Sequence, residues 1–140
     1  MTPMTGNKSA RKRGQAISEG ALVTLVLAAV VIGIFDLGLV LFIHQTFATR
    51  VRSAVRYAVV NTYDETVIKN MVLYGQPTAR ASGAFGLTAA MVSVVKTVVG
   101  TNDQRIVVTI SGYPYRFFSP WIGRVFNGRS IMASLPLETP

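Results

Sequence analysis

Nothing limits the fold of this chain more than one long apolar run. Residues Gly20 to Ile43 read GALVTLVLAAVVIGIFDLGLVLFI, which is 24 residues with a single charge, Asp36. As a helix the run would be about 36 Å long, which exceeds the hydrocarbon thickness of a bilayer, about 30 Å. A cleaved secretory signal has a core of only about 7 to 15 apolar residues and a small-residue cleavage site, whereas more apolar residues follow Ala28 and Ala29 here. The run therefore predicts a transmembrane helix.

Basic residues stand on both sides of this run. The four before it are Lys8, Arg11, Lys12 and Arg13, and the three after it are Arg50, Arg52 and Arg56. Since cytoplasmic flanks carry the larger number of cations, we expect the N-terminus in the cytoplasm and the C-terminal part outside it. The formal net charge of +8 falls to +4 over residues 15–140, where the cations are dispersed. We therefore do not expect a nucleic-acid-binding surface.

Helical periodicity continues beyond the apolar run. Apolar residues recur at spacings of three and four, at Phe47, Val51, Ala54, Val55 and Ala58, which is typical of an amphipathic helix. The span and this stretch are predicted to form one helix from about residue 17 to 60, ending at Asn61 and Thr62. Such a helix would be about 66 Å long, so it suits lateral packing against partner helices or copies of itself.

The remaining residues, 61–140, predict a small domain, which we call the head. Thr62 as a cap, followed by Asp64 and Glu65, precedes a short helix over 66–74 that Gly75 and Pro77 close. Residues 79–90 predict a loop. Strands are expected over 91–99 and 105–111, joined by a hairpin at 100–103, with a third strand near 129–137. The expected fold class is α+β, with the short helix packed on one face of a three-stranded antiparallel sheet.

A short segment between the predicted strands contains the aromatic residues Tyr113, Tyr115 and Trp121 together with the cation Arg116. Such a cluster closes a small core or makes a subunit contact, because aromatic residues and arginine are favoured at interfaces. Stacking on single-stranded nucleic acid is a weaker alternative.

The composition excludes most catalytic chemistry. The chain has no cysteine, so it has no disulfide, thiolate metal site or Cys nucleophile, and His44 is its only histidine. A His-based triad or metal site therefore lacks a second member, and no phosphate-binding glycine motif is present. Asp64 and Glu65 are adjacent, so on a helix they diverge by about 100° and make a poor acid/base pair. We expect no enzyme activity, no cofactor and no metal.

The residues just before the span form a second recognisable pattern. A basic leader ends at Gly14, Gln15 follows, and Glu19 stands five residues after the glycine. This arrangement resembles the processing site of type IV prepilins. The resemblance implies that a prepilin peptidase cuts after Gly14 on the cytoplasmic side, removes the leader and leaves Gln15 as the new N-terminus. It also implies that Glu19 meets the terminal amine of an adjacent subunit; the simpler interpretation is that Glu19 favours the helix N-terminus through the macrodipole.

The likeness extends over about 45 residues. It runs from Arg13 through Glu19 to the Gly33 to Gly38 segment centred on Asp36, and then to Ala54-Val55-Arg56-Tyr57-Ala58-Val59. Beyond these residues, 69–75 is also similar to such heads. Together these motifs resemble the TadE-like family of pseudopilins of Tad (tight adherence) pili. Major pilins of this type usually place tyrosine after the glutamate, whereas Gly20 follows Glu19 here. The departure argues against the main filament subunit.

Asp36 has two interpretations. An ionisable group near the bilayer centre costs at least about 2.5 to 3.5 kcal/mol. The residue could lie at the outer interface, since it stands seven residues before Ile43. With the family motif taken into account, we favour a polar contact with a neighbouring helix that sets the register of an assembly.

The resemblance implies a pilin-like organisation with a leader at 1–14, a transmembrane and amphipathic helix at 15–60 and an extracytoplasmic head at 61–140. It implies a minor pilin or pseudopilin of a Tad-type pilus or a related secretion apparatus, in the bacterial inner membrane. The expected partners are membrane lipid, a prepilin peptidase, other pilin subunits and the assembly platform. Two alternatives stay open: an uncleaved single-pass adaptor or sensor with a periplasmic domain, and a DNA-uptake pseudopilin.

Overall fold

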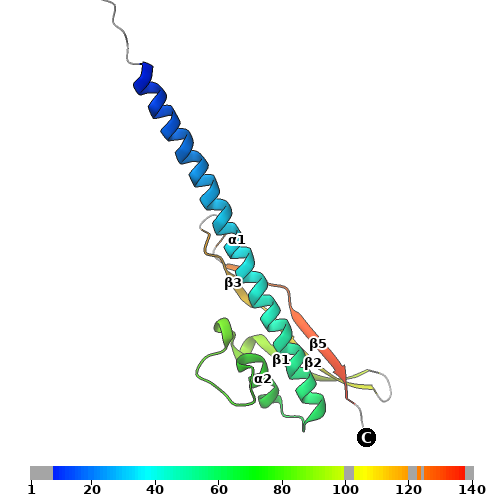
Figure 1. The fold of residues 1–140 in the computed structure, drawn as a ribbon. Coiled ribbons are helices and arrows are strands. Elements are labelled where there is room, and N and C mark those ends of the chain that lie inside the picture. The colour runs from blue at the N-terminus through cyan, green and yellow to red at the C-terminus, as the bar shows by residue number, and fades with distance from the viewer. Residues whose placement is uncertain (1–7, 100–102, 120–122, 124, 138–140) are drawn as a thin grey trace, which may run out of the picture.

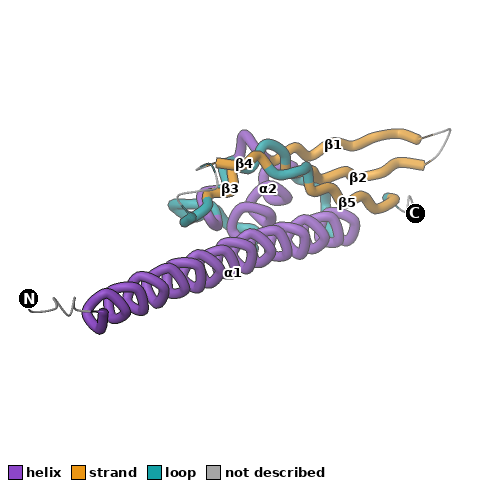
Figure 2. Tube along the Cα trace, turned by 90° about the horizontal axis from the view of Figure 1, so that it is seen from above, coloured by secondary structure: helices purple, strands orange, loops and turns teal. Residues whose placement is uncertain are grey.

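The chain folds as a long helix with a small α+β head on its C-terminal half (Figure 1). The structure is a computed structural model that describes residues 8–99, 103–119, 123 and 125–137. Figure 2 shows the helices on one side of the sheet and the N-terminal half of the long helix extending beyond the head. This confirms the expected order of one long helix, one short helix and a three-stranded antiparallel sheet.

The long helix, α1 (Lys8–Val60), is continuous through the apolar run and the amphipathic stretch. Its end at Val60 agrees with the stop predicted at Asn61. Its start does not, because the helix begins at Lys8 and not near residue 17. The prediction started the helix at the apolar residues, but Lys, Arg and Ala are all good helix formers. A single glycine, Gly14, costs only about 1 kcal/mol within a helix and does not end it.

The short helix, α2 (Glu65–Tyr74), is capped at both ends by its own sequence. The cap is Asp64 and not Thr62: its carboxylate accepts the backbone N–H groups of Thr66 and Val67 at 2.8 and 3.3 Å. Gly75 ends the helix in the left-handed region, at φ 74°, where glycine is favoured because it has no Cβ.

Arg50 of α1 closes the C-terminal end of α2. Its guanidinium donates to the carbonyl of Leu73 at 2.7 Å and to that of Val72 at 3.4 Å. These carbonyls belong to the last turn of α2, where they lack helical partners. The sequence placed Arg50 among the flanking charges of the span, and nothing local in the sequence indicated this contact.

Replacing Arg50 by alanine is expected to lower the free energy of unfolding of the head by about 1 to 3 kcal/mol, because the donor is lost while the buried carbonyl acceptor remains without it. Urea titration of the detergent-solubilised chain measures the change. The matched control is Arg56→Ala, two turns further along α1 and exposed, which should change stability by less than about 0.5 kcal/mol. Equal effects of the two substitutions would refute the capping role.

The sheet has the order β1-β2-β5 and is antiparallel throughout. Its strands are β1 (Val92–Val99), β2 (Asp103–Ile110) and β5 (Ile131–Pro136). The predicted strands are thus confirmed to within two residues at each end, while residues 100–102 of the predicted hairpin turn lie outside the described part. Val94, Val108 and Ala133 are register partners on the inner face, where α1 and α2 pack.

The core joins the second half of α1 to α2 and the sheet. Its members from α1 are Ile43, Phe47, Val51, Ala54, Val55 and Ala58. Five of these six residues were predicted from their spacing. The same cluster includes Ile68, Val72 and Leu73 of α2, Ile106, Val108 and Ile110 of β2, and also Leu87, Val92, Val94, Tyr113 and Tyr115.

A second, two-stranded sheet was not predicted. It pairs β3 (Pro114–Arg116) with β4 (Val125–Asn127) within the aromatic segment and the residues that follow it. The expected loop at 79–90 contains two 3₁₀ turns, η1 (Ala84–Gly86) and η2 (Ala89–Met91). Figure 1 shows β3 alongside the middle of α1, on the side of the head nearer the N-terminus.

Candidate functional site

The environment of α1 changes abruptly along its length. From residue 14 to residue 42 most side chains are exposed, including Leu22, Val26, Val30, Ile34 and Phe35, whereas Phe47 and Val51 are fully buried. Among the described residues one helix, within Gly14–Val60, is long and apolar enough to span a membrane, with a mean hydropathy of 2.8 over its most apolar window. Only 11% of that window is buried. The N-terminal half is therefore not a core helix of the head.

The predicted processing residues lie together at the start of this exposed half. Gly14, Gln15 and Glu19 are all exposed and helical, and the Ser18 hydroxyl donates to the carbonyl of Gln15 at 2.8 Å. The backbone of Lys8, Arg11, Lys12 and Arg13 continues the helix, but their side chains lie outside the described part. A peptidase that reads an extended chain would have to unwind the first turns of α1 to reach the Gly14–Gln15 bond.

Asp36 lies at the junction between the exposed half of α1 and the head. It is only 2% exposed, and its two carboxylate oxygens accept the successive backbone N–H groups of Phe118 and Ser119 at 2.7 and 2.8 Å. We call this pair of hydrogen bonds the Asp36 clasp. Bonds to an ionised acceptor are about twice as strong as neutral ones, so the clasp offsets part of the cost of placing a carboxylate in an apolar run.

The clasp gives Asp36 a partner that neither sequence interpretation considered. The acceptor and the donors are 82 and 83 residues apart in the chain. The contact is with a loop of the same chain, so the structure does not require a neighbouring helix to satisfy this carboxylate. A role for Asp36 in assembly remains a prediction, and the clasp suggests that it would act through the position of the loop.

Two residues of the predicted aromatic cluster close the core. The ring of Tyr113 packs edge to face against Phe47 at 4.7 Å and against Tyr115 at 5.0 Å. The Tyr113 hydroxyl donates to the carbonyl of Phe85 at 2.7 Å, and the Tyr115 hydroxyl lies 3.4 Å from Nδ1 of His44. Of the two interpretations, core closure fits Tyr113 and Tyr115, since both are buried and their rings are not available to a second subunit. Arg116 is exposed, and Trp121 lies outside the described residues.

Phe85 has an unusual backbone conformation, and the aromatic residues around it hold it in place. It is the one non-glycine residue with positive φ in the described part, at 54°, a conformation that is unusual for a bulky side chain. Its ring packs edge to face on Phe42 at 5.9 Å and on Phe47 at 6.2 Å. The two rings of α1 and the Tyr113 hydroxyl therefore fix the 79–90 loop against the helix.

The two phenols predict a loss of head stability in alkali. Burial raises the pKa of Tyr113 above its ordinary value of 10.0, although Arg116 lowers it in part. Burial, reinforced by Tyr113, also raises the pKa of Tyr115. Because the unfolded phenols ionise first, this stabilisation is complete below about pH 10 and is lost as the pH rises through the folded values. The thermal midpoint should fall between about pH 8 and about pH 11, and by less in a Tyr113→Phe/Tyr115→Phe double variant; an equal fall in both proteins would contradict the assignment.

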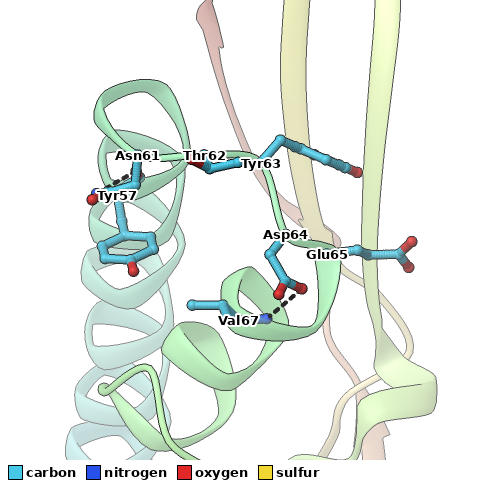
Figure 3. Close-up of a pocket in the computed structure, with 7 residues that line it drawn as sticks. All are labelled: Tyr57, Asn61, Thr62, Tyr63, Asp64, Glu65 and Val67. Atoms are coloured by element: carbon cyan, nitrogen blue, oxygen red, sulfur yellow. Dashed lines mark hydrogen bonds between the residues drawn. The ribbon is translucent and has the colours of Figure 1, made fainter.

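A surface depression lies at the far end of α1, lined by Tyr57, Asn61, Thr62, Tyr63, Asp64, Glu65 and Val67 (Figure 3). Three of its polar side chains make structural contacts, of which two are hydrogen bonds: Asp64 caps α2, and Asn61 donates to the carbonyl of Tyr57 at 3.0 Å. Glu65 pairs with Lys69 at 2.7 Å, one turn along α2. Asp64 and Glu65 thus stand at the N-terminus of α2, where Asp64 takes the place of the predicted cap, Thr62.

No metal-binding group of three or more His, Asp or Glu side chains occurs in the described part of the chain.

Comparisons with protein-family models, with characterised proteins and with solved structures find no match to this chain. The features of this chain that bear on its function are therefore its sequence motifs and the geometry of α1, the Asp36 clasp and the loop that it holds.

Proposed function

We propose that this chain is a minor pilin or pseudopilin that takes part in assembly of a Tad-type pilus or a related secretion apparatus. In this proposal α1 enters the bacterial inner membrane with its N-terminus in the cytoplasm, and the head lies on the outer side. A prepilin peptidase trims the chain after Gly14, and the N-terminal half of α1 then packs against other pilin subunits. The protein has no catalytic role of its own.

The observation that carries the proposal is the division of α1 into two halves. The C-terminal half is the central element of a folded head, while the N-terminal half exposes apolar side chains on nearly every face. Burying one such side chain yields about 1.5 to 3 kcal/mol, so the exposed half requires either lipid or neighbouring helices. A pilin-like protein uses both environments in turn, first as a membrane precursor and then as a packed subunit.

Glycines in the exposed half give independent support. A Cβ added at Gly14, Gly20, Gly33 or Gly38 would meet no other atom within 4 Å. Glycine costs about 0.5 to 1 kcal/mol relative to alanine inside a helix, and packing within this chain does not explain that cost at any of the four positions. Small residues do permit close approach of helices in a membrane or an assembly, and a glycine before a scissile bond permits local unwinding.

The mass of the protein extracted from the membranes of its own host tests the processing step. A mature form that begins at Gln15 would support the proposal. An intact N-terminus would contradict it and favour the uncleaved adaptor or sensor. The matched variants are Gly14→Val and Gly33→Val, at two positions where an added Cβ meets nothing within 4 Å. Only the first should block cleavage.

A further inference from the structure

The Asp36 clasp fixes how far the head reaches along the apolar half of α1. Asp36 stands 17 residues after Glu19, which corresponds to about 25 Å along the helix axis. If Glu19 marks the inner boundary of the hydrocarbon layer, a thickness of about 30 Å leaves Asp36 about 5 Å below the outer boundary. The loop that Asp36 holds would then lie below the surface of the membrane.

Apolar side chains around the Asp36 clasp are exposed, which suits a position below the surface of the membrane. Phe118 is 85% exposed although both of its neighbours are more buried, and Phe35, on the facing turn of α1, is 75% exposed. Between loop and helix is an apolar cavity of about 450 Å³, lined by Val31, Ile32, Phe35, Asp36, Leu39 and Phe118. In β4, Val125 and Phe126 are also exposed, at 58% and 63%.

We propose that the loop of residues 117–119 is a lipid contact of the head: it dips into the outer leaflet and inserts Phe118 at the boundary between headgroups and acyl chains. This inference rests on the membrane span proposed above. The Asp36 clasp supplies partners to two backbone N–H groups of the loop, those of Phe118 and Ser119, and unpaired N–H groups are costly in hydrocarbon.

Lipid is the occupant that the geometry favours over a protein partner. The surface formed by Phe118 and Phe35 is continuous with the exposed apolar side chains of the proposed span, at Val31 and Ile34. The expected depth of about 5 Å lies within the range of about 5 to 10 Å at which amphipathic elements rest in the interface. Arg116 is exposed two residues before Phe118, where its long side chain can reach lipid phosphates.

Depth-dependent quenching tests this contact. The chain has no cysteine, so single substitutions allow one fluorophore to be attached at a chosen site in the full-length protein. Phe118→Cys, Val26→Cys and Thr62→Cys are reconstituted in vesicles of phosphatidylethanolamine and phosphatidylglycerol that contain brominated lipid. All three positions are exposed, so labelling disturbs the fold little.

We expect quenching at position 118 to reach at least about half of that at position 26, because both sites contact acyl chains. Position 62, at the far end of α1, should show almost none. Quenching at 26 but not at 118 would overturn the lipid contact while leaving the span intact. A loss of lipid quenching at 118 when the protein-to-lipid ratio is raised tenfold would assign the loop to a second copy of the chain, and would equally overturn the proposal. Absence of quenching at 26 would refute the span itself.

Discussion

Replacing Phe47 by alanine is expected to unfold the head. The Phe47 side chain is fully buried, and its ring packs on Tyr113 and Phe85, so its removal leaves a cavity between α1, Tyr113 and the 79–90 loop. A buried Phe→Ala change costs about 3 to 5 kcal/mol. Small domains have a total stability of about 5 to 15 kcal/mol, and a head of this size stands near the lower limit. Urea titration of the detergent-solubilised chain and its near-ultraviolet circular dichroism would measure the loss.

The same helix offers a matched control. Phe35 lies twelve residues earlier on α1 and is 75% exposed, so Phe35→Ala deletes the same ring from a surface position. It should change head stability by less than about 0.5 kcal/mol. If Phe47→Ala were as mild as Phe35→Ala, the helix would not be part of the head core, and the two halves of α1 would not differ in role.

Replacing Asp36 by alanine is expected to release the loop at 117–119 from α1. The substitution removes both acceptors of the Asp36 clasp, and hydrogen bonds to charged groups contribute about 1.5 to 3 kcal/mol each. The amides of Phe118 and Ser119 should therefore exchange with solvent about 10 to 100 times faster. Hydrogen exchange on the full chain in detergent micelles, followed by mass spectrometry of the peptide that contains these residues, measures the change.

A second carboxylate provides the control for this experiment. Asp64 also accepts two backbone N–H groups, at the start of α2, so Asp64→Ala should speed exchange there and leave the 117–119 loop protected. Under the proposed function, Asp36→Ala also leaves membrane insertion intact and reduces pilus assembly. Unchanged exchange at 118 and 119 would contradict the clasp, and unchanged piliation would contradict its role in assembly.

Helices and strands that are defined by the spacing of nearby residues could be predicted from the sequence. The stripe from Phe47 to Ala58 was predictable because its spacing of three and four needs no knowledge of the partner. The same holds for α2, which has an acidic start and ends at Gly75, and for the Val-rich strands β1 and β2. In each case the residues that define the element lie within about ten positions of one another.

Features that join distant parts of the chain could not be read in this way. The Asp36 clasp and the contact of Arg50 with Leu73 depend on how the head folds back along α1. Asp36 and Arg50 stood out in the sequence as charges in or beside the apolar run, but nothing indicated their partners. The exposure of Phe118 could not be predicted either, because it depends on how its segment packs against α1. Tyr113 and Tyr115 were found by composition, but only the packing on Phe47 showed that they belong to the core.

Under the proposed function, the transfer of residues 20–43 of α1 from water into a lipid bilayer is the step on which all others depend. The behaviour of the purified full-length chain without detergent tests this step. We expect the chain to stay with the membrane through alkaline carbonate extraction and to aggregate when detergent is withdrawn from the pure protein. A monodisperse, monomeric and soluble chain under those conditions, with its apolar helix protected from exchange, would contradict it.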